Sequence, residues 1–318
     1  MDRTEKILHL CNIKGKGLEI GPSFSPVVSK KDGYDVETID HLDKEGLINK
    51  YSNIGIDTSK VEEVDYVWNG ETYTELTGKA DHYDYIIASH VIEHVCCLIS
   101  TLNDISNLLK YDGTLSLVVP DKRYTLDYFR PSTDIQKVID CYLSGSKTIH
   151  SPGTVLSHYL NVCKNGEFAA WSRDMPVRNV SIFEPFNKAR DFFNLSLNSE
   201  EYIDAHSWVF TQASFELLMY DLNCLGYTNL RVVKTLSSVD NEFYVSLQKK
   251  REQIVSDNEV RLKLLLTIAE EPREESQLLS EINYLKRELD KLHNSNSWKI
   301  TRPLRALRQI FSGDKKKK

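Results

Sequence analysis

Residues 83–95 read YDYIIASHVIEHV, and the first six of them decide the fold class. Residues 83–88 form a nearly continuous apolar run, which is typical of a strand that is buried on both faces. Strands of that kind belong to parallel sheets whose two faces are covered by helices. The stretch therefore predicts a central strand of an α/β domain.

Strands and helices alternate on both sides of this run. Short apolar stretches between turn residues predict further strands at 17–20, 36–39, 64–68 and 114–119. Helical spacing of apolar residues predicts helices at 92–109 and 212–225, and a turn at Asp112-Gly113 follows the first of them. The stretches 230–235 and 242–248 predict a hairpin. The pattern predicts a doubly wound fold with a seven-stranded, mostly parallel sheet and a terminal antiparallel strand.

Changes in composition divide the 318 residues into three parts. We expect the α/β domain to span 1–250, with an insertion at about 124–205 that is rich in aromatic residues, His and Asn. Residues 251–295 are charged and helical, and Pro272 is expected to interrupt the helix. A heptad seam of about two heptads follows, formed by Leu278, Ile282, Leu285, Leu289 and Leu292. It predicts either a short coiled coil that joins two copies through residues 278–292, or a helix docked on its own domain.

Charge and cysteine content limit the function classes. The last twenty residues hold eight basic residues against one aspartate, which leaves the rest of the chain at −13 within a total of −6. An acidic body argues against nucleic-acid binding, whereas the basic amphipathic tail at 296–318 suits an anionic surface. We find no signal peptide and no membrane-spanning stretch. The six cysteines lack zinc or disulfide spacing, so we expect a cytoplasmic protein with reduced thiols and no metal site.

Gly21 follows the first predicted strand, at the edge of the sheet where α/β domains bind ligands. A dinucleotide would need further glycines in this loop, which counts against a NAD-dependent oxidoreductase. Glu19 suits an ammonium group better than a phosphate. Asp40, at the end of the second strand, could accept hydrogen bonds from ribose hydroxyls or could cap the following helix.

Residues 84–95 resemble the fourth-strand motif of class I S-adenosylmethionine (SAM)-dependent methyltransferases, and 108–115 resemble their next motif. The resemblance implies that SAM is the cofactor. It assigns Glu19 and Gly21 to the methionine end of SAM, and Asp40 to its ribose. Ser23 belongs to the same loop, and Ser89 and His90 would lie along the cofactor. Asn69 would contact the adenine or serve only as a turn residue.

A narrower resemblance concerns residues 119–131, 150–154 and 206–208, which are similar to methyltransferases of bacterial cell-surface polysaccharide synthesis. Residues 296–305 are similar to tails on glycan-assembly enzymes. This resemblance implies an O-methyltransferase acting on a saccharide or phosphosaccharide, such as a lipid-linked O-antigen at its growing end, at the inner face of the cell membrane. The alternatives are a methyltransferase for a small molecule or lipid precursor, and a non-catalytic scaffold that recruits glycosyltransferases.

A hydroxyl acceptor would need a general base, whereas an acceptor that is already a phosphate would not. The candidates for the base are Asp121, His90, His150, His158 and His206. His94, one helical turn beyond His90, is expected to be structural. Arg123, Tyr124, Arg130 and His206 are the predicted acceptor-binding residues, with the two arginines placed to hold a phosphate or carboxylate.

Overall fold

The computed structural model describes residues 1–145, 148–199, 201–237 and 240–294. The chain divides into two compact units, Met1–Leu264 and Leu265–Lys318. The predicted basic tail at 296–318 lies outside the described residues.

The first unit is built on a seven-stranded sheet with the strand order β3-β2-β1-β4-β5-β9-β8. The strands are β1 Gly17–Ile20, β2 Val36–Asp40, β3 Tyr66–Val67, β4 Tyr83–Ser89, β5 Leu109–Pro120, β8 Leu230–Ser237 and β9 Glu242–Lys249. Strands β1 to β5 pair in parallel, while β9 runs antiparallel to both β5 and β8. The predicted sheet is therefore confirmed, and its antiparallel strand is the last one in the sequence.

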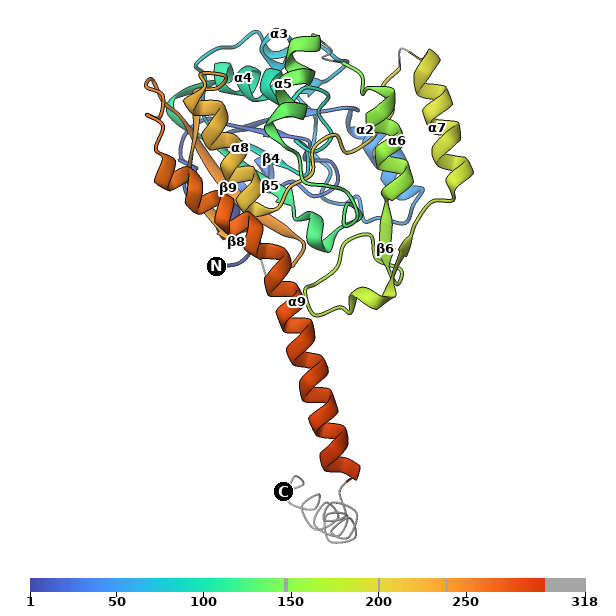
Figure 1. The fold of residues 1–318 in the computed structure, drawn as a ribbon. Helices are drawn as coiled ribbons and strands as arrows, with labels where there is room; N and C mark the ends of the chain where they lie inside the picture. Colours follow the sequence, from blue (N-terminus) through green and yellow to red (C-terminus); the bar gives the residue numbers. More distant parts are fainter. Residues whose placement is uncertain (146–147, 200, 238–239, 295–318) are drawn as a thin grey trace, which may run out of the picture. The chain divides into compact units, whose positions relative to one another are not determined.

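Helices pack on the two faces of this sheet (Figure 1). They are α1 Arg3–Leu8, α2 Lys44–Ser52, α3 Tyr73–Thr77, α4 Leu98–Leu108 and α8 Gln212–Cys224. Neighbouring residues of β4 point to opposite faces, because side chains alternate along a strand. Ile86 belongs to the core cluster that includes α4 and α8, whereas Ile87 belongs to a second cluster with Ile7 of α1. This arrangement explains why the run at 83–88 is apolar on both sides.

The helix predicted at 92–109 is shorter than expected. Helix α4 begins at Leu98, and residues 91–97 form an irregular segment with turns. His90 has a φ of +55°, outside the helical region. The carbonyl of Glu93 accepts a hydrogen bond from the backbone N–H of Ser207 at 2.7 Å. Because its backbone is engaged in tertiary contacts, this segment stays irregular and lies along the edge of the sheet.

Two other boundaries differ from the prediction. The turn expected at Asp112-Gly113 is a bulge inside β5, because Leu109 pairs with Tyr83 and Thr114 pairs with Tyr85. Four residues of β5 therefore stand opposite a single residue of β4. The strand expected at 64–68 is reduced to β3, which spans two residues.

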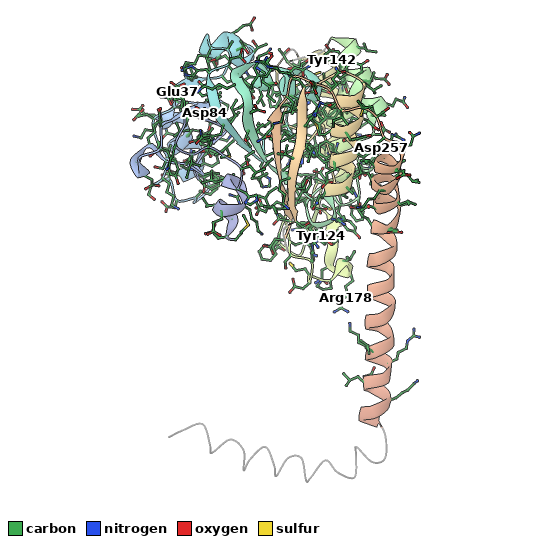
Figure 2. The ribbon with its side chains drawn as sticks, turned by 90° about the vertical axis from the view of Figure 1, so that its left-hand side faces the viewer. Glu37, Asp84, Tyr124, Tyr142, Arg178 and Asp257 are labelled. Atoms are coloured by element: carbon green, nitrogen blue, oxygen red, sulfur yellow. The ribbon has the colours of Figure 1, made fainter. Side chains whose placement is uncertain are left out.

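Between β5 and α8 the chain forms helices and a small two-stranded sheet. These elements are α5 Ile135–Ser144, α6 Pro152–Asn161, β6 Cys163–Asn165, β7 Val180–Ile182 and α7 Phe186–Asn198. Short 3₁₀ helices also occur in the described part of the chain, at Lys30–Asp32, Lys122–Tyr124 and Val177–Asn179. Helix α6 packs against α7, and α5 contacts α4 and α8. In Figure 2, Tyr124, which follows β5, lies well apart from Asp84 near the start of β4.

Helix α9, Asn258–Asn294, begins in the first unit and continues in the second. The predicted interruption at Pro272 is wrong, since the helix continues through that position. Proline in a helix interior costs about 3 kcal/mol because it removes one backbone hydrogen bond, and the strong helix formers on either side offset that cost. Every helix among the described residues is too short or too polar to span a bilayer.

Candidate active site

The loop after β1 is supported from beneath by Glu19. This side chain is 2% exposed, and its carboxylate accepts hydrogen bonds from the backbone N–H groups of Val27 at 2.7 Å and Val28 at 3.1 Å. Burial raises the pKa of Glu19 to about 7. The predicted contact with the methionine end of a cofactor is therefore corrected, because Glu19 instead determines the shape of the loop.

The same loop supplies two residues with left-handed backbone to a cavity. Gly21 has a φ of +68°, and a Cβ at this position would lie 3.0 Å from Cγ2 of Val91. Ser23 has a φ of +54°, and its backbone N–H donates to Oδ2 of Asp40 at 2.8 Å. The Ser23 hydroxyl is buried without a hydrogen-bond partner among the described residues. The loop therefore offers a close backbone approach and an unused hydroxyl.

The cavity has a volume of about 580 Å³ and lies at the carboxyl ends of β1, β2 and β4. Its walls come from the segments that follow β1, β2, β3 and β4 and from the segment before α8. The lining includes Gly21, Ser23, Asp40, His41, Trp68, Gly70, Tyr73, His90, His94, Tyr202 and Asp204. A volume of this size suits a ligand as large as a nucleoside that carries a substituent of amino-acid size.

Asp40 lines the cavity at the end of β2. Its Oδ1 accepts from the backbone N–H of His41 at 2.8 Å and lies 2.6 Å from the Nδ1 of that residue, while Oδ2 accepts from Ser23. A carboxylate offers about four acceptor positions. Asp40 therefore retains the capacity to accept one more hydrogen bond from a ligand hydroxyl.

Asn69 behaves as a turn residue. It is exposed, its backbone N–H donates to Glu71 Oε2 at 3.0 Å, and its side-chain amide lies 3.4 Å from the carbonyl of Val67. The residues on either side, Trp68 and Gly70, line the cavity instead. The structure therefore favours the turn interpretation of Asn69 over an adenine contact.

The end of β4 presents His90 to the cavity, held between two carboxylates. Its Nε2 lies 2.8 Å from Glu242 and its Nδ1 lies 3.4 Å from Glu93. Burial opposes the charge of this ring, but the hydrogen bonds to Glu242 and Glu93 outweigh it and raise the pKa of His90 to about 9. His90 is therefore protonated at neutral pH, so the prediction of a general base at this position is wrong. The neighbouring Ser89 hydroxyl accepts from Arg3 at 3.0 Å and does not contribute to the cavity wall.

The predicted arginine clamp is also wrong. Arg123 donates to the buried Asp121 through Nε at 2.9 Å and Nη2 at 2.6 Å, and Arg130, itself 3% exposed, donates to Asp127 at 2.7 Å. The ring of Tyr124 lies 5.6 Å from the guanidinium of Arg123. Each arginine thus neutralises an aspartate of its own segment, and Asp121 faces Arg123 instead of a ligand as a base would.

His150 and His158 are buried outside the cavity wall. Nδ1 of His150 lies 2.7 Å from the Ser207 hydroxyl, and Nδ1 of His158 accepts from the backbone N–H of His206 at 3.3 Å. Burial lowers the pKa of His150 to about 4 and that of His158 to about 3. Both imidazoles are neutral and engaged with the protein, so their predicted catalytic role is corrected to a structural one.

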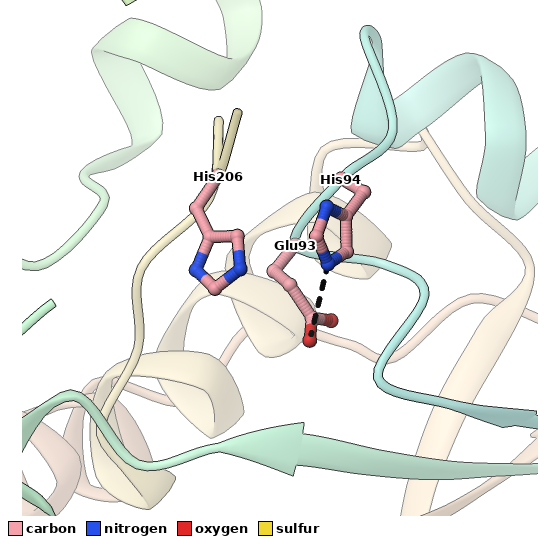
Figure 3. A group of neighbouring side chains, drawn as sticks. All are labelled: Glu93, His94 and His206. Atoms are coloured by element: carbon pink, nitrogen blue, oxygen red, sulfur yellow. Dashed lines mark ion pairs between the residues drawn. The ribbon is translucent and has the colours of Figure 1, made fainter. Parts of the chain in front are cut away.

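His94, which was expected from the sequence to be structural, contributes to the candidate site. It lines the cavity, and its Nδ1 lies 2.7 Å from Asp204. Tyr202 donates through its hydroxyl to the carbonyl of His94 at 3.1 Å. Figure 3 shows that His94, Glu93 and His206 converge. The Glu-His pair at 93–94 was visible in the sequence, but nothing there connected it with residues 202–206.

The sequence matches a family model described as a methyltransferase domain over residues 15–224. Among solved structures, the chain is similar to a SAM-dependent methyltransferase from Methanosarcina mazei, with 13% identity, a TM-score of 0.40, and coverage of 79% of this chain and 100% of that one. It is also similar to the CcbJ methyltransferase from Streptomyces caelestis, with 11% identity, a TM-score of 0.40, and coverage of 78% and 97%. No curated protein sequence matches the chain.

Proposed function

The chain belongs to the methyltransferase domain family, and from that membership we propose that it transfers a methyl group to a hydroxyl oxygen of a saccharide. It is an enzyme, and its cofactor is SAM. The observation that carries the proposal is the cavity wall at the end of β4, where His90, His94, Tyr202 and Asp204 meet. A hydroxyl acceptor requires an ionisable wall of this kind, because it loses a proton as it is methylated.

The residues at the other end of the cavity fit the cofactor. Gly21 allows close backbone approach, and the buried Ser23 hydroxyl has no partner among the described residues. Asp40 has remaining capacity for a ribose hydroxyl. Trp68 and Tyr73 add aromatic surface, which suits the adenine ring. These residues would hold SAM.

When bound, SAM supplies an electrophilic methyl group, whose bond to sulfur breaks with the electron pair left on sulfur as the bond to the acceptor oxygen forms. We assign the activation of that oxygen to the acceptor end of the cavity, where His94 lines the wall. Asp204 accepts from Nδ1 of this ring at 2.7 Å and so fixes its orientation. Tyr202 holds the backbone at the same point. His90, positively charged between Glu93 and Glu242, adds a cation to the wall.

Because both arginines are paired within the protein, fewer classes of acceptor remain favoured. Arg123 and Arg130 are engaged with Asp121 and Asp127, so the support for a phosphate clamp is gone. A sugar hydroxyl is then favoured over a phosphate as the methylated group. We propose that the acceptor is the growing end of a lipid-linked surface glycan such as O-antigen, and that the enzyme works at the inner face of the membrane, close to glycosyltransferases. This step is supported by the sequence at 119–131 and by the basic tail.

The test is transfer of a labelled methyl group from SAM to a panel of lipid-linked glycans, with mass analysis of the products. We expect methylation of a sugar hydroxyl, and a loss of turnover of about 100-fold or more in His94→Ala. His9→Ala, at an exposed position of the N-terminal segment, is the matched control. Binding of S-adenosylhomocysteine should be unchanged in both variants. Methylation of a quinone or lipid precursor with no transfer to any glycan would contradict the proposal.

A further inference from the structure

We propose that Glu93, His94 and His206 bind one divalent first-row transition-metal ion at the acceptor end of the cavity. The purpose of the ion, activation of the acceptor oxygen, rests on the proposed function, whereas the site itself rests on geometry alone. The three side chains come from the segment after β4 and from the irregular segment before α8. They converge in Figure 3.

The spacing of the three groups suits a shared ion. One ligand atom from each side chain can be chosen so that all lie within 4.8 Å of one another. Nε2 of His94 lies 4.0 Å from Oε1 of Glu93. The rings of His94 and His206 have centroids 4.5 Å apart and stand nearly perpendicular, at 85°. Small side-chain movements would bring the ligand atoms of Glu93, His94 and His206 within coordination distance of a shared ion.

Both histidines are held by a carboxylate through the ring nitrogen that faces away from the shared centre. Asp204 lies 2.7 Å from Nδ1 of His94, and Asp127 lies 2.5 Å from Nδ1 of His206. A carboxylate at Nδ1 keeps the proton on that nitrogen and leaves the lone pair on Nε2. Metal-binding histidines are generally supported in this way. The same support occurs twice here and directs both free nitrogens to one point.

The carboxylate of Glu93 supplies an independent observation. Glu93 is 1% exposed, and its Oε2 has no hydrogen-bond partner among the described residues. Its Oε1 is engaged, since it lies 3.4 Å from Nδ1 of His90. Leaving a buried carboxylate oxygen unpaired is costly. A bound cation would offset the cost of burying that unpaired oxygen.

A second group, Asp127, His158 and His206, is equally compact but is less suited to an ion. Both oxygens of Asp127 are already engaged, Oδ1 with Arg130 at 2.7 Å and Oδ2 with Nδ1 of His206 at 2.5 Å, whereas Oε2 of Glu93 has no partner among the described residues. His158 uses its Nδ1 to accept from the backbone of His206. We therefore assign Asp127 to supporting His206.

Two imidazoles and one carboxylate favour ions such as Zn²⁺ over Mg²⁺ or Ca²⁺, which prefer oxygen ligands. Three protein ligands leave a coordination position open, as in catalytic zinc sites. His94 lines the cavity, so the open position would face the acceptor. An ion there lowers the pKa of a hydroxyl that binds it, and the proton is then lost to water with no change of oxidation state.

The test uses the full chain, freed of metal by a chelator and titrated with ZnCl₂ in a calorimeter without SAM or acceptor. We expect one Zn²⁺ per chain, and Co²⁺ should give the visible absorption of a site with nitrogen ligands. Glu93→Gln removes a ligand charge, and Asp204→Asn removes the support of His94 at an exposed side chain. Each should weaken Zn²⁺ binding about 10- to 100-fold. His9→Ala should bind Zn²⁺ like the unaltered protein.

Circular dichroism shows which variants fold, and if Glu93→Gln does not, Asp204→Asn decides. Failure of the unaltered chain to bind Zn²⁺, or unchanged affinity in the folded variants, would overturn the proposal. This outcome is distinguishable from failure of the proposed function, because the titration involves no saccharide. Zn²⁺ binding without glycan methylation would leave the site in place and remove only the saccharide acceptor.

Discussion

The carboxylate of Glu19 is buried under the loop that carries Gly21 and Ser23. It accepts hydrogen bonds from two consecutive backbone N–H groups, those of Val27 and Val28, and burial raises its pKa to about 7 from an ordinary value of 4.5. A carboxyl group whose pKa rises on folding stabilises the folded state fully at pH values below 4.5. That contribution is lost as the pH rises through about 7.

Replacing Glu19 with Gln should therefore flatten the pH dependence of stability. The free energy of unfolding of the unaltered protein should fall, relative to Glu19→Gln, by about 3 kcal/mol between pH 4.5 and pH 7. Urea denaturation at several pH values measures this difference. Glu45→Gln, at an exposed position of α2, is the matched control and should follow the unaltered protein. A constant difference between Glu19→Gln and the unaltered protein would contradict the burial of a titrating carboxyl group.

Sequence reasoning at the scale of single residues succeeds where a residue stands at the end of a strand. Gly21, Asp40 and His90 meet at one cavity because β1, β2 and β4 are parallel and end at the same edge. The partners of these residues follow no local rule. Glu242 is 152 residues from His90 in the sequence, and Asp204 is 110 residues from His94. The charge states of these residues and the identity of their partners could therefore be learned only from the tertiary structure.

The proposed zinc site shows the same limit of reasoning from the sequence. The cysteine spacing gave no reason to expect a metal, and the proposed ligands are a Glu-His pair and a histidine more than one hundred residues later. Adjacent residues such as Glu93 and His94 share an ion only where the backbone is irregular, and a helix was predicted there. The absence of that helix is what lets both side chains approach His206.

At the scale of elements, helix α9 has exposed apolar residues whose role remains to be explained. Leu285 and Leu289 are 57% and 52% exposed, although both belong to the predicted heptad seam. The other seam positions, Leu278, Ile282 and Leu292, have side chains outside the described part of the chain. Exposed leucines four residues apart on one helix face favour a partner helix, and a second copy of the chain is the simplest one.

We therefore expect the protein to dimerise through residues 278–292. Sedimentation velocity over a range of concentrations should show a monomer–dimer equilibrium. Leu285→Asp should shift it to monomer, because a charge at a seam position would be buried on association. Glu270→Gln, an exposed position of the same helix, should have no effect. A chain that stays monomeric at tens of micromolar would contradict the coiled coil.

At the scale of the whole molecule, the sheet was predictable because alternating strands and helices leave few topologies open. The apolar runs fixed which segments are central, and the hairpin of β8 and β9 followed from its spacing. The segment between β5 and α8 was not predictable in the same way. Its helices are held by contacts such as the stacking of Tyr159 on Phe192, with ring centroids 4.0 Å apart, which have no sequence periodicity.

The tail at 296–318 carries the prediction about location in the cell. Pro303 suits the first turn of a helix, and Leu304, Leu307 and Phe311 would then share one face. Basic residues flank that face and follow it, and each contributes about 1 kcal/mol near an anionic bilayer.

Deleting residues 296–318 should release the protein from anionic vesicles at low salt without reducing the binding of S-adenosylhomocysteine. A variant that lacks only the four terminal lysines separates the contribution of the apolar face to vesicle binding from that of the lysine run. If the full-length protein does not sediment with these vesicles, the tail contacts a protein partner such as a glycosyltransferase instead.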